Sequence, residues 1–167
     1  SGALAAPIPE WHNIECLVTR DFYHRYTVDE HTLVAIEELE NIQDGRFAGL
    51  MNGMEDPSLV RFSLLMHDIG KGTGRDHSEV SVEVAEAVLS RLGAPELDRE
   101  AIVYLVRNHL ALSSVMNSRD LSDPATAEAL AQNVGTVERL KLLTMLTYAD
   151  ISAVNPHAMS PWRLEQL

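Results

Sequence analysis

The segment that decides the fold of this chain is Phe62-Ser63-Leu64-Leu65-Met66-His67-Asp68-Ile69-Gly70-Lys71-Gly72. In it, an apolar run ends in an adjacent imidazole and carboxylate, His67 and Asp68. Burying an ionisable side chain without a partner is unfavourable by several kcal/mol, so this pair needs compensating groups from other parts of the chain.

Three further ionisable residues occupy apolar helix faces. At about 100° per residue, His31, His109 and Asp150 each align with apolar residues three and four positions away. The usual interpretation of one such histidine is a hydrogen-bonded core residue. Together with His67-Asp68, however, these residues put inward-facing ionisable groups on four predicted helices. Helical bundles with carboxylate–histidine metal sites are built in this way, so the pattern favours a common metal centre.

The donor types narrow the choice of metal. Imidazole nitrogens mixed with carboxylate oxygens, and no thiolates, suit first-row transition ions and zinc. Cys16 is the only cysteine, which excludes both an internal disulfide and a multi-cysteine zinc site. We expect a divalent metal, one or two ions, drawn from Mn, Fe, Mg, Co, Ni or Zn.

Periodicity predicts an all-α bundle of about six or more helices, with strand signals almost absent. A capping box, Thr27 with Glu30, marks the start of the first strong helix. The predicted helices cover residues 10–22 (weakly), 27–42, a stretch after Pro57 ending near Gly70, 76–93, 98–112, a short one opened by Pro124, and 137–154. Residues 1–9 are expected to be an extended lead-in, residues 44–57 a long loop and residues 113–123 a polar loop.

Composition excludes several classes of protein. The 167 residues suit a single domain, and 46% hydrophobic with 23% charged residues is ordinary globular composition. No apolar run approaches the ~20 residues of a membrane span. A net charge of −12 argues against a nucleic-acid partner. The same charge would repel a free nucleotide, unless bound cations reverse the local field. The single cysteine fits a cytoplasmic location.

The order of the ionisable residues resembles the HD superfamily of metal-dependent phosphohydrolases. His31, His67-Asp68 and Asp150 match its H…HD…D pattern, whose four positions bind a metal in that family. The segments 23–33, 76–79, 109–110, 119–121 and 146–151 are also similar to the central HD domain of the bacterial PII uridylyltransferase/uridylyl-removing enzymes. The resemblance covers about residues 7–167.

The resemblance implies a role for each candidate residue. The first metal would be bound by His31, His67, Asp68 and Asp150, with Asp68 able to bridge to a second. His77 and His109 would complete that second site, although a surface histidine is the alternative interpretation of His77. The Lys71 ammonium would hold phosphate oxygens, which makes Asp68 and Lys71 the catalytic candidates. The alternative for Lys71 is a lysine that offsets a helix dipole.

The implied reaction is removal of UMP from uridylylated PII signalling protein. The whole chain, residues 1–167, would be a single HD domain from a larger protein, separated from its nucleotidyltransferase and ACT domains. Related HD domains hydrolyse guanosine tetraphosphate, cyclic nucleotides or deoxynucleoside triphosphates, and these substrates stay open. A non-catalytic regulatory module is a second alternative. A redox di-iron protein is disfavoured, because Glu-x-x-His pairs are missing.

Overall fold

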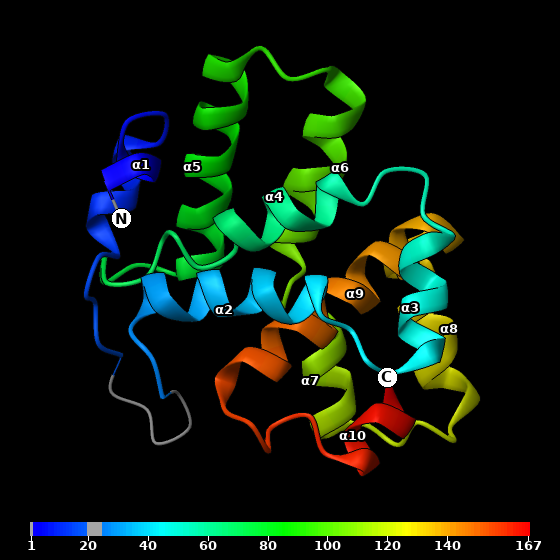
Figure 1. The fold of residues 1–167 in the computed structure, drawn as a ribbon. Helices are drawn as coiled ribbons and strands as arrows, with labels where there is room; N and C mark the ends of the chain where they lie inside the picture. The colour runs from blue at the N-terminus through cyan, green and yellow to red at the C-terminus, as the bar shows by residue number, and fades with distance from the viewer. Residues whose placement is uncertain (1, 20–24) are drawn as a thin grey trace.

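The structure, a computed structural model, describes residues 2–19 and 25–167 (Figure 1). Within these ranges every regular element is helical and no strand occurs, so the predicted all-α fold is confirmed. The elements are α1 (Gly2–Ala5), the 3-10 helix η1 (Pro9–Asn13), α2 (Val28–Glu40), α3 (Gly45–Asn52), α4 (Ser58–Met66), α5 (His77–Leu92), α6 (Glu96–Arg107), α7 (Ala111–Ser118), α8 (Pro124–Val134), α9 (Val137–Val154) and α10 (Pro161–Gln166).

Local start and stop signals explain several of these bounds. The backbone N–H of Thr27 and its hydroxyl donate to the Glu30 carboxylate, which forms the predicted capping box of α2. The Asp76 carboxylate accepts from the Glu79 N–H at the start of α5. That helix ends at Gly93, whose φ of 68° is the left-handed conformation that a glycine adopts without strain.

Five sequence-based expectations are wrong or incomplete. Residues 1–9 are not extended throughout, because Gly2–Ala5 forms a helical turn and Pro9 begins η1. The weak helix over residues 10–22 is only η1 and turns, and residues 20–22 lie outside the described residues. The loop over residues 44–57 contains α3, whose first amides are capped by the Asp44 carboxylate.

The predicted helix over residues 98–112 is two helices. It ends early because the Asn108 side-chain amide donates to the Tyr104 carbonyl, 2.8 Å away, which terminates α6. A new helix, α7, then occupies part of the expected polar loop over residues 113–123. The serines of α7 make this segment look polar in the sequence, but the helix contributes two buried core residues, Leu112 and Met116.

Helix α4 is the centre of the arrangement. It contacts α2, α5, α6 and α9, and it lies between the α5–α6 pair above and the α7–α10 group below in Figure 1. One hydrophobic cluster surrounds α9 and includes Leu64 of α4, while a second joins η1, α5 and α6 and includes Met66. The C-terminal end of α4 therefore lies where both cores meet. No described helix combines the length and hydropathy that a membrane crossing requires.

We expect Leu143→Ala to lower the free energy of unfolding by about 2–5 kcal/mol, because Leu143 is fully buried on α9 and its truncation leaves a cavity. Leu97→Ala, at a position 79% exposed, is the control and should change stability by less than about 0.5 kcal/mol. Urea unfolding followed by circular dichroism measures both. Equal losses in the two variants would contradict this description of the core.

Candidate metal centre

Six sequence-predicted residues converge from different helices. His31 lies in the first turn of α2, and His67 and Asp68 directly follow the last residue of α4. Asp150 lies just before the last turn of α9, His77 is the first residue of α5, and His109 lies in the turn between α6 and α7. The structure brings them into two groups of three donors that could hold metal ions, with the donor atoms in each group within 4.8 Å of one another.

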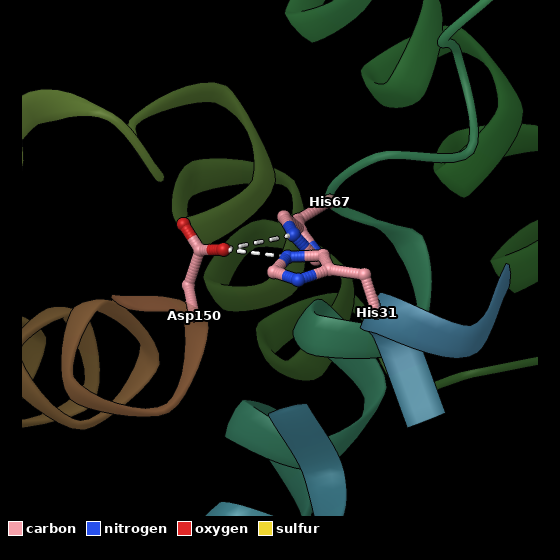
Figure 2. A group of neighbouring side chains, drawn as sticks. All are labelled: His31, His67 and Asp150. Carbon is pink, nitrogen blue, oxygen red and sulfur yellow. Dashed lines mark hydrogen bonds and ion pairs between the residues drawn. The ribbon is translucent and has the colours of Figure 1, made fainter. Parts of the chain in front are cut away.

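The first triad consists of His31, His67 and Asp150. Figure 2 shows the Asp150 carboxylate facing both imidazole rings. Its Oδ1 lies 2.8 Å from His31 Nε2 and 3.5 Å from His67 Nε2. Both histidines are buried and the carboxylate is 16% exposed, so this group is almost closed to bulk water.

The second triad consists of Asp68, His77 and His109. The two Nε2 atoms are 3.3 Å apart, and Asp68 Oδ1 lies 3.8 Å from that of His77 and 4.0 Å from that of His109. Asp68 and His109 are buried, but the His77 side chain is 30% exposed. This triad therefore has the more open side.

Asp68, a member of the second triad, also lies close to the first. Its Oδ1 faces the two histidines of its own triad, while its Oδ2 lies 3.3 Å from His67 Nε2 and 4.0 Å from His31 Nε2. One carboxylate with one oxygen toward each group is the arrangement that a bridging ligand between two ions requires. The bridging role that the resemblance implies for Asp68 stays a prediction.

Backbone carbonyls orient two of the imidazoles. His67 Nδ1 lies 2.7 Å from the Leu64 carbonyl oxygen, and His109 Nδ1 lies 2.7 Å from that of Val106. Because a carbonyl only accepts, Nδ1 carries the proton and Nε2 faces the centre, as in metal-binding histidines. His67 Nε2 is also buried without a hydrogen-bond partner among the described residues, so a cation fits this donor set.

The ionisable groups of the site shift one another's pKa values. Burial by itself would lower the pKa of His67, but the Asp68 and Asp150 carboxylates raise it to about 10. Burial also disfavours the anions of Asp68 and Asp150. The His67 imidazolium nevertheless holds the pKa of Asp68 well below its usual range, and the His31 and His67 rings do the same for Asp150. Burial and the positive charge of His67 lower the pKa of His109 to about 4, so this ring is neutral at neutral pH.

Lys71 contacts the same carboxylate. Its Nζ lies 2.6 Å from Asp68 Oδ2 and its side chain is 18% exposed. Lys71 thus forms an ion pair with Asp68, whereas its contact with a phosphate stays a prediction. Arg75, four residues further along the chain, forms an exposed ion pair with Glu83.

The sequence interpretation missed one supporting residue, Ser81. Its hydroxyl oxygen accepts a hydrogen bond from the Gly70 N–H at 3.0 Å, which connects the turn after Asp68 to α5. A serine inside an amphipathic helix has no sequence signature of such a role. The sequence placed Gly70 near the end of one predicted helix and Ser81 within another, over residues 76–93, but it did not predict the contact between them.

The family assignment follows from these observations and one comparison. The HD domain family matches residues 28–150, which include every residue of both triads. The chain belongs to this family. Membership, together with a His/Asp cluster that could hold a metal, supports the class of metal-dependent phosphohydrolases.

Two similar relatives narrow the comparison. The chain is 38% identical over 169 residues to a bifunctional uridylyltransferase/uridylyl-removing enzyme of Ruegeria pomeroyi, covering 97% of this chain and 19% of that protein. It is 35% identical over 170 residues to the enzyme of the same name from Gluconobacter oxydans, covering 98% of this chain and 18% of that protein. The chain thus spans about a fifth of the length of these relatives.

We expect the two triads to respond separately to substitution. His31→Ala should weaken binding of one Mn²⁺ ion and His77→Ala binding of the other, because each removes one donor from a different triad. Calorimetric titration with Mn²⁺ measures both steps. His157→Ala, which removes an exposed histidine, is the control and should bind Mn²⁺ like the unchanged chain. Binding unaffected in both triad variants would exclude these ligand sets.

Proposed function

We propose that this domain hydrolyses the phosphodiester that joins UMP to a tyrosine of uridylylated PII. Two observations support this substrate. The segments quoted from the sequence resemble the HD domain of uridylyl-removing enzymes, and both relatives carry that activity in their names. We extend only this hydrolytic part of the relatives' name to the chain, because the chain spans so little of their length.

The observation that carries the proposal is the position of Asp68 between the two triads. We propose that the first triad with Asp68 holds one divalent ion and that the second triad, which includes Asp68, holds another. Bound ions of this kind lower the pKa of a coordinated water from ~15.7 towards ~7 and polarise the phosphoryl group. The donor set and the burial of its nitrogens fit such ions.

The chain's own residues supply the rest of the reaction geometry. The partly exposed side of the second triad, at His77, is where a phosphodiester on a protein surface can approach. Lys71 is close enough to the bridging carboxylate for its ammonium to contact the phosphate oxygens. Water adds to phosphorus, the bond between phosphorus and the tyrosine oxygen breaks, and tyrosine leaves with a proton while UMP is released.

The acidic surface is compatible with this proposal. A net charge of −12 disfavours a phosphorylated ligand at long range. Two divalent ions and Lys71 would reverse that field within the site itself. The substrate would then be held by local contacts and by its protein part.

We expect the chain to release UMP from uridylylated PII faster than it turns over guanosine tetraphosphate, a cyclic nucleotide or a deoxynucleoside triphosphate. A chelator should stop the release and added Mn²⁺ should restore it. Asp68→Ala should abolish it with helix content retained, because the second triad loses a member and the first triad loses the carboxylate beside His67. The exposed Glu128→Ala variant is the control. Preference for a free nucleotide would redirect the proposal to that substrate, and hydrolysis undiminished in Asp68→Ala would exclude the site.

We expect Lys71→Ala to lower kcat by about 10²–10³-fold, the usual effect of removing one group that stabilises transition-state charge. Mn²⁺ binding should persist, since Lys71 is in neither triad. The only other lysine, Lys141, pairs with Glu138 away from the triads, so Lys141→Ala is a matched control for steady-state assays. An unchanged kcat in Lys71→Ala would leave this lysine as an ion-pair partner of Asp68 only.

A further inference from the structure

The turn that follows Asp68 packs directly against the first turns of α5. The Gly70 N–H donates to Ser81 Oγ at 3.0 Å, and both residues are buried. The Gly70 carbonyl in turn accepts a hydrogen bond from the Thr73 hydroxyl at 3.0 Å. Both polar groups of the Gly70 backbone are therefore held, which fixes the turn between the two elements that carry Asp68 and His77.

The backbone of α5 lies so close to Gly70 that no side chain fits at this position. A Cβ placed there would overlap the carbonyl oxygen of His77 and come within 2.6 Å of the backbone nitrogen of Ser81. The obstructing atoms are helix backbone, which cannot rotate away as the end of a flexible side chain can. The absence of a Cβ thus lets the turn and the helix start come together.

These contacts close a short ring through the second triad. From Asp68 the ring runs along the backbone to Gly70, crosses the hydrogen bond to Ser81 and follows α5 back to His77. The 3.8 Å separation of His77 Nε2 and Asp68 Oδ1 then closes it. His31 and Asp150 of the first triad come from α2 and α9 and lie outside the ring.

We propose that Gly70 and Ser81 are positioning residues that hold His77 against Asp68 and so decide whether the second ion binds. This inference rests on the metal centre of the proposed function. The second triad depends on the pair because His77 begins a helix and is the most exposed of the triad histidines. His67 and His109, in contrast, are each held by a backbone carbonyl at Nδ1. Metal ligands must keep their positions within about 0.5 Å, so a small shift of α5 is sufficient to disrupt the site.

The test is Ser81→Ala in the whole chain, with Mn²⁺ as the probe. We expect the second Mn²⁺ step to weaken by about 10- to 100-fold, the usual effect of losing a partner behind a ligand. The first step should keep its affinity. In this variant, electron paramagnetic resonance should detect the spin-coupled Mn²⁺ pair only at a correspondingly higher Mn²⁺ concentration. Ser63→Ala is the matched control, because Ser63 is equally buried but its hydroxyl donates within its own helix, to Leu59.

Gly70→Ala tests the same contact from the other side. It should also weaken the binding of the second Mn²⁺ ion and leave the affinity for the first unchanged, since the added Cβ separates the turn from α5. Amide hydrogen exchange without metal gives an independent readout, because the Gly70 N–H should exchange faster in Ser81→Ala than in Ser63→Ala. Circular dichroism establishes that each variant is folded.

Two results would overturn the inference: wild-type affinity for both ions in Ser81→Ala and Gly70→Ala, or an equal weakening of both steps. The second result would indicate a general role in stability. Failure of the proposed function looks different, since a chain that binds two Mn²⁺ ions in this way but releases no UMP contradicts only the substrate. A wild-type chain that binds one ion contradicts this inference and leaves one-ion hydrolysis open.

Discussion

Burial of opposite charges beside one another is the constraint on which this structure depends. His31, His67 and Asp68 are almost inaccessible to solvent, and Asp150 is nearly so. These buried ionisable groups are tolerable only because their partners lie within about 4 Å, as the raised pKa of His67 and the lowered pKa values of Asp68 and Asp150 express. A change that moves one partner leaves another buried and uncompensated, so the helices that carry them must keep their relative positions.

Helix packing meets this constraint by converging on the end of α4. That helix contacts four others and contributes to both hydrophobic clusters, and His67 and Asp68 follow its last residue. Because the chain leaves the helix there, two adjacent side chains that would diverge on a regular helix can face neighbouring donor groups. Asp68 consequently has one carboxylate oxygen near His67 of the first triad and the other near His77 of the second.

The parts of the site that follow helical periodicity could be predicted from sequence. An ionisable residue on an apolar helix face is recognisable in the sequence, and this pattern identified His31, His109 and Asp150. The start and end signals also predicted the bounds of α5 and α9 closely. Other parts depend on tertiary contacts. The Asn108 cap that separates α6 from α7 resembles an ordinary helical residue in sequence, and the serine-rich α7 conceals its buried positions. The Gly70–Ser81 contact joins residues eleven positions apart on two elements, so neither residue reveals it alone.

Local periodicity also explains why His77 was ambiguous. At the start of a helix beyond a glycine turn, a solvent-facing ring is the default expectation, and nothing nearby in the sequence contradicts it. The ring instead lies 3.3 Å from the buried nitrogen of His109, a residue 32 positions away. Such a proximity depends on how α5 and α6 pack, which single-residue patterns do not encode.

The capping box of α2 has a consequence for ligand order. Thr27 and Glu30 close the helix start, and the His31 N–H donates to the Thr27 carbonyl, so the imidazole belongs to the very turn that the cap stabilises. Asp29 of the same turn accepts from the backbone of Cys16 and ties it to the preceding segment. Helix ends usually fray, and a fraying end would spread this ring over many orientations. Here the conformational entropy of that turn is lost during folding, so the orientation of the His31 ring is already restricted before any ligand binds.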